Sequence, residues 1–153
     1  MTSSMQQLAA DLRGTLETAV PMLLSIEPET AAEKPAPGKW SSKEILGHLI
    51  DSASNNHHKI LRTKLHEMVA FPAYEQDLWV SAQHYQEEDW YILVELWRYQ
   101  NLHLAHIIER LLEEELAHQC SIGNDKPVTL EFIATDYLRH LRHHLLQIIP
   151  ALR

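Results

Sequence analysis

Four long segments of this chain repeat their apolar residues at the period of an α-helix. The stripe of the first segment consists of Leu8, Leu12, Leu16, Val20 and Leu23. Residues three or four apart lie on one face of a helix, so such a stripe predicts an amphipathic helix that buries this face. We expect helices over residues 5–24, 41–68, 89–117 and 129–150. Helices of this kind bury their apolar faces against one another, which predicts an all-α four-helix bundle.

Proline and glycine mark the connections between the predicted helices. They fall around residues 28–38, 71–88 and 120–128, which we expect to be loops. Ser41-Ser-Lys-Glu44 has the capping-box pattern that opens a helix, and Thr129 is a suitable N-cap. No segment alternates polar and apolar residues for long enough to predict a strand. With 153 residues and no internal repeat, the chain is predicted to form one domain over residues 1–153.

The charge and cysteine content exclude several classes of partner. Thirteen basic against 21 acidic residues give a net charge of -8, which disfavours binding to nucleic acid or to an anionic membrane. No apolar run reaches about 18 residues, so no membrane-spanning helix is expected. The N-terminus has no secretory-signal pattern, and the single cysteine, Cys120, fits a reducing compartment. We therefore expect a cytoplasmic protein.

Histidine is unusually frequent, with 11 residues, and two of them lie on the apolar face of the last predicted helix. An α-helix advances about 100° per residue, so His140 and His144 lie about 40° apart and share the sector of Ile133 and Tyr137. His143 falls on the polar side and is expected to face solvent. Two neutral imidazoles are costly in a core unless a ligand uses them, and imidazole is a common ligand for transition metals. The pair predicts half of a metal site.

The second predicted helix offers two histidines that could complete the site. His48 and His57 both lie at edges of its apolar stripe, so the helical period leaves either possible. An isolated histidine at such an edge is more often a hydrogen-bonded core residue than a metal ligand. The polar residues that could border the same cavity, and so orient a ligand or the substrate, are Glu44, Asp51 and Asn101.

Three runs of the chain resemble motifs of the DinB-like family, also called the DinB/YfiT superfamily. Lys39-Trp-Ser-Ser-Lys-Glu-Ile-Leu-Gly-His-Leu-Ile-Asp-Ser52 resembles the family's signature at the start of its second helix. His140-Leu-Arg-His-His-Leu-Leu-Gln-Ile148 resembles its closing motif, His-x-x-x-His-Leu-x-Gln-Ile, and residues 71–80 resemble its loop between helices two and three. The order and spacing of these motifs agree with the predicted helices, and together they cover most of the chain.

This resemblance implies an up-down-down-up four-helix bundle that binds a divalent ion, nickel or zinc, through one histidine of the second helix and two of the fourth. Carried over by motif, the ligands are His48, His140 and His144, so the resemblance selects His48 over His57. Three histidine ligands leave positions open for water or a thiol, as in catalytic sites. The chain departs from the family at Leu141, where many relatives have aspartate, and in the middle of its third predicted helix.

The resemblance leads to three hypotheses. The first is a metal-dependent enzyme that transfers a low-molecular-weight thiol, such as bacillithiol, mycothiol or glutathione, to a small-molecule electrophile. Hydrolysis by metal-bound water is a variant of it. The second is a non-catalytic metal-binding or stress-response bundle, and the third is an interaction module without metal. Many relatives are dimers, and a homodimer surface is suggested by Leu93, Leu102, Leu104 and Leu111.

Overall fold

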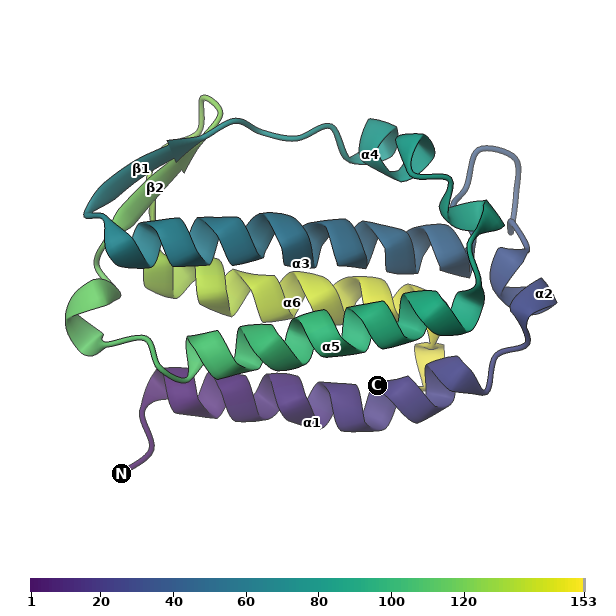
Figure 1. Ribbon diagram of the computed structural model, residues 1–153, viewed down its shortest axis with the longest axis horizontal. Coiled ribbons are helices and arrows are strands. Elements are labelled where there is room, and N and C mark those ends of the chain that lie inside the picture. The colour runs from purple at the N-terminus through teal and green to yellow at the C-terminus, as the bar shows by residue number, and fades with distance from the viewer. Residues whose placement is uncertain (153) are drawn as a thin grey trace.

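Four long helices form the body of the protein, as the sequence predicts. The computed structural model describes residues 1–152, and its long helices are α1 (Ser4–Leu24), α3 (Ser42–Leu65), α5 (Trp90–Ile108) and α6 (Leu130–Ile148). Helices α1 and α6 run in one direction, and α3 and α5 run in the other (Figure 1). The bundle is therefore up-down-down-up, and a long crossover joins the parallel neighbours α3 and α5. This confirms the predicted fold class.

Side-chain caps define where the long helices begin. Ser3 and Ser41 form capping boxes before α1 and α3, and the side chains of Asp89 and Thr129 accept hydrogen bonds from the first turns of α5 and α6. Each cap satisfies amide groups that the start of a helix leaves without partners. The capped start of α3 fixes the backbone about two turns before His48.

The core lies along the axis of the bundle, where the four long helices bury their apolar stripes. Trp90 and Trp97 of α5 are fully buried, and the Trp90 indole donates a hydrogen bond to the Leu23 carbonyl at 2.9 Å. Helix α5 packs against both α1 and α3, and α6 closes the ring against the same two helices. Within residues 1–152, none of the helices has the length and apolar character needed to cross a bilayer.

The third predicted helix is shorter than expected. Helix α5 ends at Ile108 instead of residue 117. Leu112, which follows the end of this helix, is 51% exposed, whereas Leu111 and Leu116 are buried. The chain turns here so that these two leucines close the end of the bundle. The Glu115 carboxylate stabilises the turn by accepting a hydrogen bond from the Leu112 amide at 2.9 Å.

A small three-stranded sheet lies at one end of the bundle, where the sequence predicts helix ends and a loop. Strand β1 (Met68–Phe71) pairs in parallel with β2 (Gln119–Ile122), and β2 pairs antiparallel with β3 (Val128–Thr129). The expectation that no strand forms is wrong. Each strand has four residues or fewer, which is too short for a period of two to be detected. The sheet is minor, and helix α3 correspondingly ends at Leu65.

The predicted loops also contain short helices. Helix α2 (Pro28–Ala32) lies in the first one, and the crossover after β1 contains α4 (Gln76–Ala82) and a 3-10 turn at Tyr85–Glu87. Figure 1 shows α4 above the N-terminal half of α3, with which it is in contact. The crossover therefore covers the part of α3 that carries the candidate site residues.

Candidate metal centre

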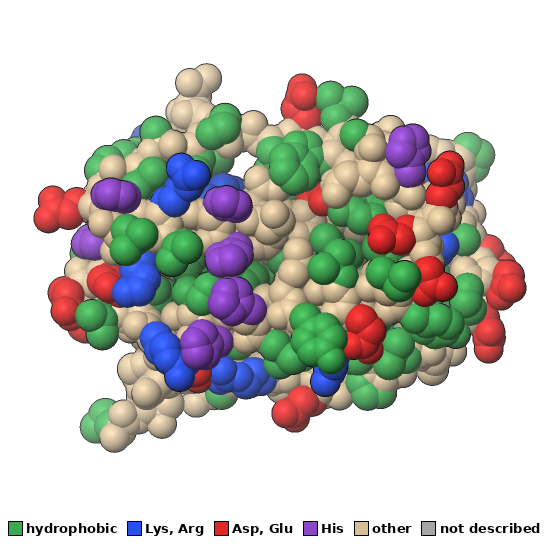
Figure 2. Space-filling view, in the orientation of Figure 1, with side chains coloured by type: hydrophobic (Ala, Val, Ile, Leu, Met, Phe, Trp, Pro, Cys, Tyr) green, Lys and Arg blue, Asp and Glu red, His purple; other side chains and the backbone are tan. Residues whose placement is uncertain are grey.

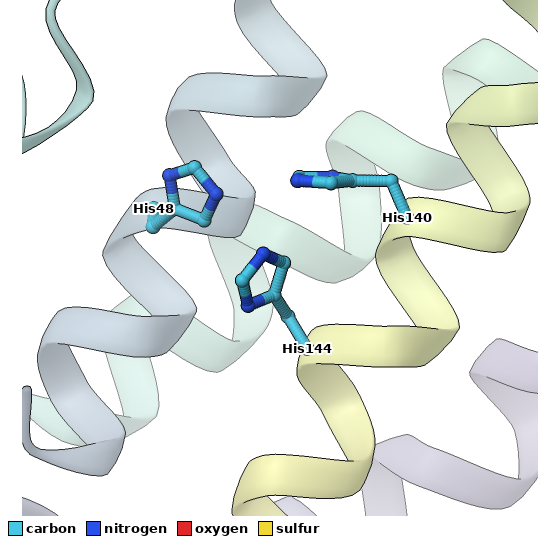
Figure 3. A group of neighbouring side chains, drawn as sticks. All are labelled: His48, His140 and His144. Carbon is cyan, nitrogen blue, oxygen red and sulfur yellow. The ribbon is translucent and has the colours of Figure 1, made fainter.

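Three histidines from two helices meet between α3 and α6. His48 comes from α3, His140 and His144 come from successive turns of α6, and their side chains point toward one another (Figure 3). Their ring centroids are 4.5 Å apart for His140 and His144, 4.7 Å for His48 and His144, and 5.3 Å for His48 and His140. One nitrogen of each ring lies within 4.8 Å of the others. Nitrogens bound to one tetrahedral zinc ion are about 3.4 Å apart, so modest ring rotations would let all three bind one ion.

His48 is fully buried and has no hydrogen-bond partner, whereas His140 and His144 are half-buried. Both ring nitrogens of His48 are unpaired, and no other side chain within residues 1–152 has two buried polar atoms in this state. Leaving a buried polar group unpaired costs about 1–3 kcal/mol. The residues present therefore fit a bound ion, which would give one of the two His48 nitrogens the partner that the protein does not supply.

The surroundings of the cluster favour neutral imidazoles. Burial, with the neighbouring His144 and His140, lowers the pKa of His48 from 6.5 to about 4. Burial and the neighbouring His144 likewise lower the pKa of His140 to about 4. Neutral imidazole is the form that binds a metal ion. At neutral pH these rings are therefore ready to bind a cation.

Two residues in contact with the cluster also line a cavity. The Trp40 ring lies 5.2 Å from the His48 ring, and Nδ1 of His144 donates a hydrogen bond to Oε1 of Gln147 at 3.0 Å. This bond leaves Nε2 of His144 unprotonated and available as a ligand. Trp40 and Gln147 belong to the wall of a cavity of about 430 Å³, which Lys39 also lines. A small molecule in this cavity would lie beside the histidine cluster.

Asp51, one turn after His48 on α3, is held by the crossover. Its Oδ1 accepts hydrogen bonds from the Tyr85 hydroxyl and the Gln83 amide, each at 2.7 Å. The Tyr85 ring packs so closely on α3 that a Cβ at position 47 would overlap it, so only Gly47 fits there. Oδ2 of Asp51 is buried and unpaired, and burial raises the pKa of this carboxyl. Sequence reasoning misses Tyr85 and Gln83, because only the folded crossover brings them to α3.

The other two polar candidates, Glu44 and Asn101, have partners elsewhere: Glu44 in a helix cap and Asn101 in the core. Glu44 belongs to the capping box of α3 and pairs with Lys34 at 2.6 Å. Asn101 is fully buried, its amide nitrogen donates to the Trp97 carbonyl at 2.8 Å, and its oxygen accepts from the Tyr137 hydroxyl at 2.5 Å. These contacts account for both side chains without the histidine cluster.

Three further residues considered from the sequence are not members of the cluster. His57 faces α5, where its ring lies 5.2 Å from that of His103. His143 is exposed, as predicted, and its ring lies beside the cluster, 5.1 Å from that of His144. Cys120 is buried in β2, at the end of the bundle that carries the sheet (Figure 1).

Two comparisons with known proteins bear on this chain: one matches its fold, and the other matches most of its sequence. YfiT from Bacillus subtilis, described as "a probable metal-dependent hydrolase with an unusual four-helix bundle topology", matches with a TM-score of 0.78 and 17% sequence identity. The match covers 93% of this chain and 80% of that one, and at this identity it shows a shared fold. A search of the curated proteins finds no match. The sequence profile described as the DinB superfamily matches residues 7–148, so the chain belongs to the DinB superfamily.

Proposed function

We propose that this protein is a metal-dependent enzyme in which His48, His140 and His144 hold a nickel or zinc ion. We further propose that it transfers a low-molecular-weight thiol to a small-molecule electrophile. The observation that carries the proposal is the fully buried, unpaired imidazole of His48 beside two further imidazoles. A histidine with a purely structural role is expected to have a hydrogen-bond partner when it is buried.

Three protein ligands suit a catalytic ion, because a structural zinc site has a fourth. When bound, such an ion makes a coordinated thiol or water acidic enough to be a nucleophile near neutral pH. The residues of the chain hold the ion and orient the substrate. Gln147 sets the tautomer of His144 through its hydrogen bond. Asp51 is buried and accepts hydrogen bonds from Tyr85 and Gln83, so we assign it to holding the crossover against α3 one turn after His48.

The nucleophile has to come from outside the chain. Cys120 is fully buried, and burial raises the pKa of its thiol. Its neighbour Thr63 follows His48 by roughly 22 Å along α3. A thiol cosubstrate could instead reach the cluster through the cavity beside Trp40, whose lining carries one cation, Lys39, and one anion, Asp77.

Hydrolysis is the alternative reaction at the same site, and the description of YfiT favours it. It requires water at the open coordination position, and no thiol. A third outcome is a bundle that binds the ion and catalyses neither reaction. The requirement for a thiol distinguishes the first two, and the absence of both activities in metal-loaded protein identifies the third.

The test uses protein purified without a histidine tag, depleted of metal by a chelator and reloaded with Zn²⁺ or Ni²⁺. Each form is assayed with a thiol plus a chromogenic electrophile, and separately with a chromogenic ester and no thiol. We expect the reloaded protein to catalyse thiol transfer and the metal-free protein to be slower by about 100-fold or more.

The variant His140→Ala should behave like the metal-free protein. The matched control is His143→Ala, because His143 lies on the same helix but is exposed; it should keep full activity. If the reloaded protein hydrolyses the ester without a thiol and does not transfer a thiol, the hydrolase alternative is correct and the thiol-transfer proposal is wrong. Full activity of the metal-free protein would contradict metal-dependent catalysis altogether.

We also infer a homodimer, through a surface that differs from the one the sequence suggests. Leu93, Leu104 and Leu111 are buried in the bundle, so they cannot form an interface, and Leu102 is half-buried against the core. The exposed apolar side chains of α5 that remain available are Tyr91, Ile92, Leu96 and Tyr99. Light scattering should give the mass of a dimer, and Leu96→Glu should reduce it to that of one chain; a monomer at micromolar concentration would contradict this inference.

A further inference from the structure

Four histidines form a row across α3 and α5, outside the three-histidine cluster. In order along the row they are His58 and His57 of α3, then His103 and His106 of α5. Neighbouring ring centroids are 6.2, 5.2 and 6.2 Å apart. Figure 2 shows histidine side chains lined up on this face of the molecule. The packing of α3 against α5 creates the row, so it does not appear as a motif in the sequence.

The central pair, His57 and His103, has the spacing of two ligands on one ion. A ring nitrogen lies about 1.1 Å from the centre of an imidazole and about 2.1 Å from a bound zinc ion, so two rings on one tetrahedral ion have centres about 5.2 Å apart. The observed separation is 5.2 Å, with the ring planes at 78°. The two rings come from long helices that pack side by side. Such elements hold ligands more precisely than loops do.

The ring nitrogens of this pair are free to bind a ligand. Across residues 1–152, the histidines that hydrogen-bond to protein groups are His106, His118 and His144. Burial lowers the pKa of His57, and the neighbouring His103 and His58 lower it as well, which favours the neutral form. His106 differs, because the Arg110 guanidinium lies 3.0 Å from its Nδ1 and a cation there opposes metal binding.

The pair is separate from the three-histidine cluster. His57 follows His48 by nine residues on α3, which corresponds to about 13.5 Å along the helix and about 180° around it. His48 faces α6, where it contacts His140, whereas His57 faces α5. An ion at one site therefore does not share ligands with the other.

We propose that His57 and His103 form a second, exchangeable site for a divalent transition-metal ion that accepts imidazole ligands, such as Zn²⁺ or Cu²⁺. Two protein ligands leave the other coordination positions to water, so this ion binds more weakly than one held by three histidines. It also links α3 to α5. Because it binds only the folded chain at this spacing, it stabilises the fold.

The test is a Zn²⁺ titration of tag-free protein that already carries one equivalent of Zn²⁺. The wild-type protein should bind a second equivalent at least about ten-fold more weakly than the first, and its melting temperature should rise as that site fills. His103→Gln should lose the second equivalent and the rise in melting temperature, and should keep the first equivalent. His48→Leu should keep Zn²⁺ binding at His57 and His103 while it weakens binding at the three-histidine cluster. The two sites can therefore be told apart.

The matched control is His66→Gln, which removes an exposed histidine at the end of α3 and should bind Zn²⁺ like the wild type. Glutamine keeps the helix propensity at positions 57 and 103, and melting without metal verifies that the variants fold. A second equivalent that survives in both His57→Gln and His103→Gln would overturn the proposal, and so would its absence from the wild type.

Discussion

Two buried polar side chains, Asn101 and His48, have opposite hydrogen-bonding states. Both are fully buried in the bundle. Asn101 uses its amide nitrogen and its oxygen in hydrogen bonds to Trp97 and Tyr137. His48 has both nitrogens unpaired. Protein groups thus satisfy the hydrogen-bonding capacity of Asn101. No protein group does so for His48, as expected for a side chain that binds a metal ion.

The largest effect is expected when His48 is replaced by leucine. His48→Leu should lower metal affinity by about 100-fold or more, because one of three ligands is lost. In the metal-free protein the same change should raise the free energy of unfolding by about 1–2 kcal/mol, because it removes a buried, unpaired polar ring. Metal analysis and urea unfolding measure the two effects. Strong destabilisation of the metal-free protein would mean that His48 is a satisfied structural residue.

Replacing Asn101, whose hydrogen bonds are satisfied, should have the opposite effect on stability. Asn101→Leu should lower the free energy of unfolding by about 1–3 kcal/mol, because the Tyr137 hydroxyl is then buried without its partner. Metal content should not change. The double variant with Tyr137→Phe should recover much of the loss, since both partners of the hydrogen bond are then apolar. If Asn101→Leu were neutral or abolished metal binding, the contrast between the two positions would fail.

Acid should destabilise the metal-free protein within a defined window. Unfolded imidazole takes up its proton near pH 6.5, and folded His48 and His140 do so only near pH 4. Between these values the unfolded chain binds more protons, so the free energy of unfolding decreases as the pH falls from 6.5 to 4. Above pH 6.5 these two groups should contribute no slope. Denaturant midpoints measured across pH should show this, with a shallower slope in His48→Leu; an equal slope in that variant would argue against the assignment.

The smallest effect is expected at Gln147, which accepts a hydrogen bond from His144 and binds no ion itself. Gln147→Ala should reduce metal affinity by about ten-fold, the range found for residues that orient a ligand. Gln147→Glu, which keeps an acceptor, should preserve or increase the affinity. Competition with a chromogenic chelator measures both. An unchanged affinity in Gln147→Ala would show that His144 is oriented without this bond.

The four long helices and the three-histidine set could be predicted because their signals are local or carried by motifs. Apolar stripes and caps determine α1, α3, α5 and α6, and the spacing of His140 and His144 places both on one helix face. The helical period alone left both His48 and His57 open. The choice depends on which helix packs against each side of α3, which is information that only the tertiary structure contains.

The features that could not be predicted depend on contacts between distant segments. The strands pair Met68 with Gln119 and Gln119 with Thr129, and no single strand is long enough to show a pattern. The hydrogen bonds from Tyr85 and Gln83 to Asp51 require the crossover to lie on α3. The early end of α5 follows from the burial of Leu111 and Leu116 at the end of the bundle.

The most direct test of the three-histidine metal site is X-ray absorption at the metal edge of tag-free protein loaded with one equivalent of nickel or zinc. We expect three imidazole nitrogens at about 2.0–2.1 Å and further light-atom ligands from solvent. The same measurement on His143→Gln should be unchanged. A first shell with fewer than three imidazoles in the wild-type protein, or the same three-imidazole shell in His48→Leu, would contradict the assignment of His48, His140 and His144 as the metal ligands.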